Sequence, residues 1–177
     1  MTLNGFFAGP GGDISWNGHR GGEERDYAVE SMEPGNTLLF GRHTYEMMVQ
    51  WWPTAQAIQA DPIMAAGMND PQKIVFSRTL QRVDWKNARL AKGDLLEEVR
   101  ALKAKPGKDL TVLGSGSIIT QLAGAGLVDE YQFMINPVAI GGGKSVFQGL
   151  QEQLDLALVA TRVFDTGSIL LTYRPAA

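Results

Sequence analysis

The sequence predicts an α/β domain with a mixed, mostly parallel sheet and an antiparallel strand pair near its C-terminus. Three apolar strands, 36–41, 73–77 and 110–113, alternate with segments of helical periodicity, which is the pattern of an α/β sheet. Two later apolar runs, 154–164 and 168–173, are separated by three turn-forming residues and predict a hairpin.

Local signals predict the other elements. Residues 1–7 have the pattern of a strand end, and the glycine-rich segment 8–22 indicates a long mobile loop. Asp94 is placed to cap a helix that ends at Pro106-Gly107. Further helices are expected over 23–32, 43–50 and 117–125, a short one over 63–68 within the ambiguous segment 54–70, and strands over 85–90 and 130–135.

The composition is that of an ordinary globular protein of 177 residues, which is most simply one domain over 1–177. A formal charge of −3 argues against nucleic acid as a partner. The absence of cysteine excludes thiol catalysis, and His19 and His43 are too few for a histidine-rich metal site, so no metal is expected. No apolar run approaches about eighteen residues and no signal peptide is visible, so we expect no membrane contact and a cytoplasmic location.

Three strands end in glycine, serine or arginine. The first runs into Gly41-Arg42-His43-Thr44, the second into Ser77-Arg78, and the third into Gly114-Ser115-Gly116-Ser117. In an open α/β sheet ligands bind beyond the carboxyl ends of the strands, where helix N-termini and backbone N–H groups favour anions. Three such ends, two of them with an arginine, indicate a ligand with several phosphates, and a phosphorylated dinucleotide fits best.

Each of these segments also has a purely structural interpretation. The turn at Gly114 lacks the third glycine of a dinucleotide fingerprint, because Ile119 stands there, and Ser117 could simply cap a helix. Arg42 could form a surface ion pair. The run from Gly141 to Ser145 is not a phosphate-binding loop, since Val138 stands where that motif needs its first glycine. The set of segments therefore carries the prediction, and no single one does.

Taken in order, the motifs resemble the dihydrofolate reductase-like fold, and within it the reductase domain of the bifunctional riboflavin-biosynthesis deaminase–reductase and its stand-alone relatives. The resemblance covers nearly the whole chain. It is carried by Thr2-Leu3-Asn4-Gly5-Phe6, Ala8-Gly9-Pro10, Gly41-Arg42-His43-Thr44-Tyr45-Glu46, Lys73-Ile74-Val75-Phe76-Ser77-Arg78, Val112-Leu113-Gly114-Ser115-Gly116-Ser117 and Ile135-Asn136-Pro137-Val138, with Gly143-Lys144-Ser145-Val146-Phe147 last.

The resemblance implies a three-layer αβα fold and NADPH as the cofactor. Gly41, Arg42 and Thr44 would meet the pyrophosphate, and Ser77 with Arg78 the 2′-phosphate of the adenosine. The residues implied at the pyrophosphate and the nicotinamide ribose are Gly114, Ser115, Gly116, Ser117 and Ile118. The loop from Ala8 to Trp16 would close over the nicotinamide, and Ala8 is counted among the cofactor-binding residues.

The resemblance implies a pyrimidine- or pterin-like substrate, as in the riboflavin pathway. The riboflavin enzymes typically have Asp where this chain has Asn4, and Glu where it has Leu113. Asn4 can orient a substrate but cannot donate a proton as an acid does. Folate reductases instead carry an acid on the first helix, near Asp26. Three interpretations stay open: a riboflavin-type reductase, a dihydrofolate reductase, and a non-catalytic NADPH-binding protein.

Two further expectations follow from the resemblance. The family has a central strand before the segment matching Thr2 to Gly5, and here only Met1 precedes it, so we expect an earlier start or a substitute strand. Family relatives often dimerise through their sheets, so we expect a homodimer.

Overall fold

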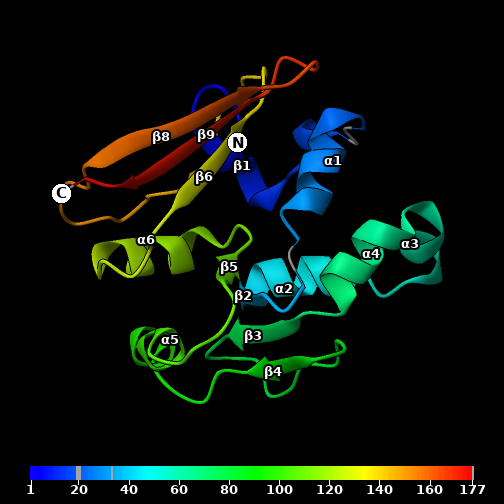
Figure 1. Ribbon diagram of the computed structural model, residues 1–177, viewed down its shortest axis with the longest axis vertical. Helices are drawn as coiled ribbons and strands as arrows, with labels where there is room; N and C mark the ends of the chain where they lie inside the picture. Colours follow the sequence, from blue (N-terminus) through cyan, green and yellow to red (C-terminus); the bar gives the residue numbers. More distant parts are fainter. Residues whose placement is uncertain (19–20, 33, 177) are drawn as a thin grey trace. The chain divides into compact units, whose positions relative to one another are not determined.

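A computed structural model describes residues 1–18, 21–32 and 34–176, and His19 lies outside these ranges (Figure 1). The chain forms two compact units. The first comprises Met1–Arg25 together with Ile119–Ala177, and the second comprises Asp26–Ile118. Each unit has its own strands, and the predicted α/β character with a mixed set of strands is confirmed.

The second unit contains a four-stranded sheet in the order β4-β3-β2-β5 (Figure 1). Its strands are β2 (Thr37–Gly41), β3 (Gln72–Phe76), β4 (Ala88–Leu90) and β5 (Leu110–Val112). All three pairings are parallel. The central strands β2 and β3 are buried along their middle residues, as expected for a parallel sheet with both faces covered.

The helices of this unit begin where the sequence supplies caps. The Asp94 carboxylate accepts hydrogen bonds from the backbone N–H groups of Leu96 and Glu97, so the predicted cap is confirmed. The segment 54–70 forms two helices instead of one short helix, because Thr54 and Asp61 each cap a helix start. The helices are α2 (Arg42–Val49), α3 (Ala55–Ala60), α4 (Pro62–Asn69) and α5 (Leu95–Lys103), while α1 (Glu23–Glu30) and α6 (Gly116–Gly124) contain the unit boundaries.

An aromatic core fixes the second unit. Phe40 of β2 stacks on Trp85 with ring centroids 5.9 Å apart, and Tyr45 of α2 lies 6.4 Å from the same indole. The Tyr45 hydroxyl also accepts a hydrogen bond from the Asp84 backbone N–H at 3.0 Å. The sequence predicts a strand over 85–90, but only Ala88–Leu90 are paired, so Trp85 lies before β4.

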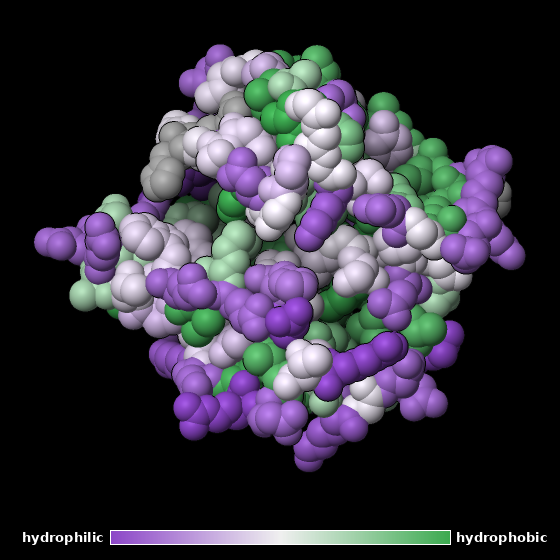
Figure 2. All heavy atoms as spheres, turned by 180° about the vertical axis from the view of Figure 1, so that it is seen from behind, coloured by the Kyte–Doolittle hydropathy of each residue, from purple (hydrophilic) through white to green (hydrophobic). Residues whose placement is uncertain are grey.

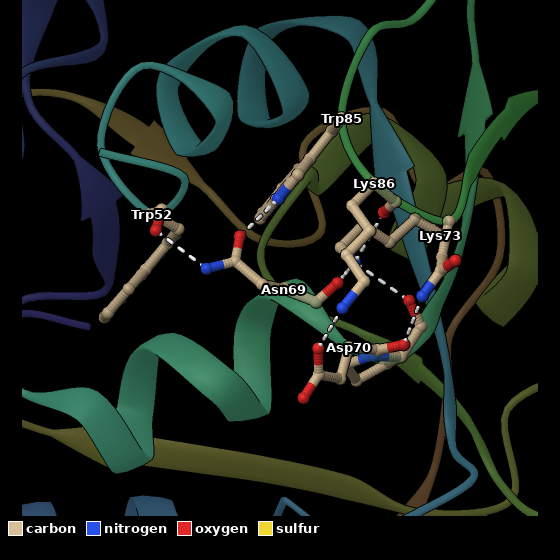
Figure 3. A network of polar contacts seen from close by, with 8 residues as sticks. Trp52, Asn69, Asp70, Lys73, Trp85 and Lys86 are labelled. Carbon is tan, nitrogen blue, oxygen red and sulfur yellow. Dashed lines mark hydrogen bonds and ion pairs between the residues drawn. The ribbon is translucent and has the colours of Figure 1, made fainter. Parts of the chain in front are cut away.

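A buried lysine lies at the start of β3 (Figure 3). The Lys73 ammonium donates to the backbone carbonyl oxygens of Asn69 and Pro71, both at 2.8 Å, and of Lys86 at 3.1 Å. It also lies 4.7 Å from the centroid of the Trp85 ring. The Asn69 side chain donates to the Trp52 carbonyl and accepts from the Trp85 indole. This network ties the end of α4 to the turn that precedes β4.

The first unit contains two antiparallel sets of strands. Strand β1 (Phe6–Ala8) pairs with β7 (Lys144–Ser145), and β9 (Ile169–Pro175) lies between β6 (Tyr131–Ile135) and β8 (Leu156–Val163). The predicted hairpin is therefore confirmed. The glycine-rich segment after β1 contains two short 3-10 helices, Pro10–Gly12 and Ser15–Asn17.

The first residues of the chain run parallel to the end of β6. Thr2 forms a parallel bridge with Asn136, and the backbone N–H of Leu3 donates to the Val138 carbonyl at 2.8 Å. Among the described strands, β5 pairs only with β2, and β6 pairs only with β9. The additional strand expected before Thr2 stays a prediction.

Within the described ranges, no helix has the length and apolar character that a membrane span requires. On the face drawn in Figure 2, hydrophilic side chains are interspersed with separate hydrophobic ones.

Candidate cofactor-binding site

The three strand ends singled out in the sequence meet at one edge of the second unit's sheet. Strand β2 lies between β3 and β5, and all three are parallel (Figure 1). Gly41 lies opposite Phe76, and Leu39 lies opposite Val112. The segments that follow these strands therefore leave the sheet side by side, as the sequence predicts.

The turn after β5 is joined to the turn after β2 by the Ser115 hydroxyl. The Gly41 backbone N–H donates to Ser115 Oγ at 2.9 Å, and Ser115 Oγ donates to Thr44 Oγ1 at 2.7 Å. Ser115 is buried and has a φ of +64°, which is unfavourable for a residue with a side chain. The two hydrogen bonds hold this backbone in place, so the hydroxyl has a structural role that local sequence did not reveal.

Glycine is needed on both sides of this contact. A Cβ on Gly41 would lie 3.2 Å from Ser115 Oγ and 3.5 Å from Ile118 Cδ1, so the two turns approach closely. Gly114 has a φ of +70°, and a Cβ there would meet nothing within 4 Å. The backbone of Gly114 is therefore open to a ligand. The Gly114–Ser115 peptide bond is trans.

Helix α6 begins at Gly116, one residue earlier than predicted. Ser117 consequently lies in the first turn of the helix and is not its cap. The Ile118 backbone N–H donates to the Ser115 carbonyl at 2.8 Å, and the Ile118 side chain is buried. Any contact of Ile118 with a ligand at this edge would involve its backbone, because its side chain belongs to the core.

Helix α2 begins directly after Gly41 without a side-chain cap. Uncapped N–H groups at a helix start and the positive end of the helix dipole both favour an anion. Arg42 stands at this start and is 40% exposed, and its guanidinium pairs with Glu46 at 3.5 Å and contacts His43 Nε2 at 3.2 Å. The surface ion pair considered for Arg42 therefore exists, and the side chain stays partly exposed at the start of the helix.

The end of β3 combines a turn-forming serine with an exposed arginine. Ser77 Oγ accepts hydrogen bonds from the backbone N–H groups of Thr79 at 3.1 Å and Leu80 at 3.0 Å. The Arg78 side chain is exposed and has no ion pair with any residue that the structure describes. Arg78 is thus a cation at the sheet edge with no counter-charge among the described residues, while Ser77 shapes the turn that presents it.

The predicted residues of the first unit have structural partners. The Asn4 amide donates to the Ile140 carbonyl at 2.8 Å, and its oxygen accepts from the Ile140 N–H at 3.3 Å. Ala8 ends β1 and is buried, and a Cβ on Gly143 would lie only 2.1 Å from its carbonyl oxygen. Lys144 and Ser145 form β7, in agreement with the rejection of a phosphate-binding loop at this segment.

Helix α1 presents a different carboxylate from the one expected. Asp26 is exposed, whereas Glu24 is 8% exposed and accepts a hydrogen bond from the Thr166 hydroxyl. The adjacent Glu23 accepts from the Asp165 backbone N–H at 3.3 Å, so the β8–β9 turn is attached to the start of α1. Sequence reasoning missed Glu24, although it precedes Ala28 by one helical turn and so falls on the face predicted to be buried.

The Trp16 side chain also has an unusual polar group. Its indole nitrogen is buried and has no hydrogen-bond acceptor among the described residues. A buried N–H without an acceptor is costly and is retained only where a function or the fold requires it. Trp16 lies in the second short helix after β1, which is the loop that the sequence assigned to the nicotinamide side.

A family comparison now identifies the chain. The model of the RibD C-terminal domain matches residues 1–170. This chain belongs to the RibD C-terminal domain family. The Bacillus subtilis protein YyaP is 32% identical over 98% of this chain and 90% of its own length.

Solved structures confirm the dihydrofolate reductase-like fold. A Shewanella sp. PV-4 protein assigned provisionally to riboflavin biosynthesis has a TM-score of 0.76 at 23% identity, covering 100% of this chain and 96% of its own. The Thermotoga maritima diaminohydroxyphosphoribosylaminopyrimidine deaminase/5-amino-6-(5-phosphoribosylamino)uracil reductase has a TM-score of 0.71 at 16% identity, covering 99% of this chain and 54% of its own. Dihydrofolate reductase from Enterococcus faecalis, complexed with NADP(H) and RAB-propyl, has a TM-score of 0.66 at 16% identity. The match covers 100% of this chain and 93% of the Enterococcus chain.

Proposed function

We propose that this protein is an NADPH-dependent reductase similar to 5-amino-6-(5-phosphoribosylamino)uracil reductase, acting in the cytoplasm on a pyrimidine- or pterin-like heterocycle. The observation that carries the proposal is the meeting of three glycine-, serine- or arginine-bearing strand ends at one sheet edge. Membership in the RibD C-terminal domain family supports it.

The residues at this edge suit a phosphorylated dinucleotide. Gly41, Arg42 and Thr44 would hold the pyrophosphate at the uncapped start of α2. Arg78, which is exposed and has no counter-charge in the described part of the chain, would hold the 2′-phosphate, with Ser77 shaping the turn. The open backbone from Gly114 to Ile118 would contact the pyrophosphate and the nicotinamide ribose, with Ala8 on the nicotinamide side.

The bound cofactor would supply the hydride, and the protein residues would orient the two reactants and manage the proton. Glu24 and Asp26 are the carboxylates of α1 that we consider as the acid. Glu24 is the better candidate because it is buried and oriented by the Thr166 hydroxyl, whereas Asp26 is exposed. Asn4 would orient the substrate or the loop around Ile140, since its amide is already paired with that backbone.

Two alternatives remain distinct. Dihydrofolate reduction requires an acid that reaches the pterin, so the buried carboxylate Glu24 favours it over a protein without any acid. A non-catalytic NADPH-binding protein is favoured by Asn4 and Leu113, which replace the acids of the riboflavin enzymes; Leu113 packs against the aromatic core of the second unit.

The test measures NADPH oxidation with an aminopyrimidine ribosyl phosphate and, separately, with dihydrofolate. We expect turnover of one of them, and Glu24→Gln should lower kcat by about 100-fold or more while leaving the NADPH affinity unchanged. Asp26→Asn is the matched control and should retain the wild-type rate. NADPH binding without turnover of either substrate would support the non-catalytic alternative. A kcat that falls with Asp26→Asn but not with Glu24→Gln would show that Asp26, and not Glu24, is the acid.

We also propose that the protein is a homodimer, as the family resemblance implies. A mass measurement in solution tests this, and a monomer would contradict it.

A further inference from the structure

The Ser115 hydroxyl lies between two turns of the second unit and is already engaged in both directions. Its oxygen accepts from the Gly41 backbone N–H at 2.9 Å, and its single proton goes to Thr44 Oγ1 at 2.7 Å. The Ser115 side chain is buried. Its proton is therefore not available to an anion at this edge, and an effect of the hydroxyl on binding has to act through Gly41 or Thr44.

The start of α2 explains what this contact achieves. Gly41 is the N-cap residue of the helix, and Thr44 is the third helical residue. A side chain at that third position commonly turns back to accept a hydrogen bond from the N-cap N–H. Here Ser115 supplies the acceptor from the end of another strand, so the Thr44 hydroxyl is released from a capping role.

The two hydrogen bonds run in one direction. A backbone N–H can only donate, so Gly41 fixes Ser115 Oγ as its acceptor and leaves the Ser115 proton for Thr44. The Thr44 hydroxyl proton itself has no acceptor among the residues that the structure describes. Thr44 is half-buried in the first turn of α2. Its proton therefore suits a ligand atom that only accepts, such as a phosphate oxygen.

The Ser115 backbone has an unfavourable conformation at this contact. Its φ of +64° lies in a region that glycine adopts freely and that a residue with a Cβ adopts rarely. Glycine would remove the backbone strain and the hydroxyl together. A strained residue in an intact fold points to a use for its side chain, and the only hydrogen bonds printed by the geometry lead to Gly41 and Thr44.

We propose that Ser115 is a positioning residue for the cofactor: its hydroxyl holds Thr44 Oγ1 in place and leaves the Thr44 proton to donate to the pyrophosphate. This role rests on the proposed function, because it requires a pyrophosphate at the start of α2. Successive hydrogen bonds polarise one another, so Gly41 and Ser115 strengthen the donor at the end of the series. A negatively charged oxygen is the acceptor that gains most from such a donor.

The test is the dissociation constant of NADPH, measured by the quenching of tryptophan fluorescence. Ser115→Gly removes the hydroxyl but suits the positive φ, and we expect it to weaken binding by about 10-fold. Ser115→Ala lacks the hydroxyl but keeps the Cβ, and it should lose a similar factor. Thr44→Val should also weaken binding by about 10-fold, whereas Thr44→Ser keeps the hydroxyl and should stay within about twofold of the wild type.

A double variant separates this role from a merely structural one. Because Ser115 acts through Thr44, Ser115→Gly/Thr44→Val should bind NADPH about as weakly as either single variant. Independent damage to the fold would instead multiply the two losses to about 100-fold. Thr120→Val is the control, since it removes a half-buried hydroxyl of α6 that donates to the Val146 carbonyl at 3.0 Å, and it should leave the dissociation constant unchanged.

Two results would overturn the proposal and leave the proposed function intact. The first is wild-type affinity for NADPH in both Ser115→Gly and Ser115→Ala. The second is a multiplied loss in the double variant, with far-ultraviolet circular dichroism confirming that the variants are folded. No binding of NADPH by the wild-type protein would instead contradict the proposed function, and the role of Ser115 would fall with it.

Discussion

The two units differ in how their strands are paired and buried. In the second unit β2 and β3 are parallel and buried in their middle residues, and only the turns after them bear the polar groups of the candidate site. In the first unit β8 is antiparallel and exposed along nearly its whole length. The parallel sheet therefore brings the turns of the candidate site together at one edge.

The same contrast separates the residues proposed to bind the cofactor from those proposed to contact the substrate. The turns at Gly41 and Gly114 are joined by one hydroxyl, so the proposed phosphate site is built inside the second unit. Asn4 and Glu24 instead depend on distant backbone, at Ile140 and at Thr166. Each of these two side chains therefore depends on a single partner far away in the sequence.

Strands β1 and β7 approach each other closely at Gly143 in the first unit. Gly143→Ala would place a Cβ 2.1 Å from the Ala8 carbonyl oxygen, so the two strands must separate. We expect urea denaturation to show a loss of about 3 kcal/mol or more in the free energy of unfolding. Gly142→Ala meets nothing within 4 Å and should change it by less than about 1 kcal/mol. Equal effects of the two substitutions would contradict the close approach.

In the second unit, the contact that we expect to matter for stability is the set of hydrogen bonds made by buried Lys73 (Figure 3). Lys73→Met would leave three backbone carbonyl oxygens without their donor, and we expect a loss of about 2–4 kcal/mol in the free energy of unfolding. Lys86→Met, which removes the exposed ion pair with Asp70, is the matched control and should cost less than about 1 kcal/mol. A similar loss in both variants would show that the buried carbonyl contacts are unimportant.

The contribution of Lys73 to the free energy of unfolding should also depend on pH. Burial lowers the pKa of Lys73 from 10.5 to about 8, with Asp70 opposing and Lys86 adding to the shift. Between these values the unfolded chain binds more protons than the folded protein, so the free energy of unfolding contributed by Lys73 rises with pH. We therefore expect the gap between wild type and Lys73→Met to widen from pH 8 to pH 10, and a constant gap would contradict the lowered pKa.

Local signals were sufficient to predict the strand ends of the candidate site and the helix cap at Asp94. Apolar runs followed by Gly41, Ser77 and Gly114 predicted which turns would meet, because parallel strands must bring their carboxyl ends to one edge. Asp94 was predicted as a cap from its spacing to Glu97.

Contacts distant in sequence were not predictable in this way. The hydroxyl of Ser115 bonds to residues about seventy positions earlier, and its positive φ depends on that contact. Glu24 is buried because Thr166 reaches it from a turn 142 positions later. Nothing in the neighbouring sequence specifies either partner. The resemblance to folate reductases pointed to Asp26 as the acid on the first helix, and that assignment stays a prediction.

The proposal depends most directly on whether the second unit's sheet edge binds a phosphorylated dinucleotide selectively. The decisive measurement is a titration of the purified protein with NADPH and with NADH, followed by the quenching of tryptophan fluorescence. We expect NADPH to bind at least about tenfold more tightly than NADH, and Arg78→Ala to remove most of that difference, because Arg78 is the exposed cation at the end of β3. Binding of neither nucleotide, or equal binding of both by the wild type, would contradict the assignment of this edge to NADPH.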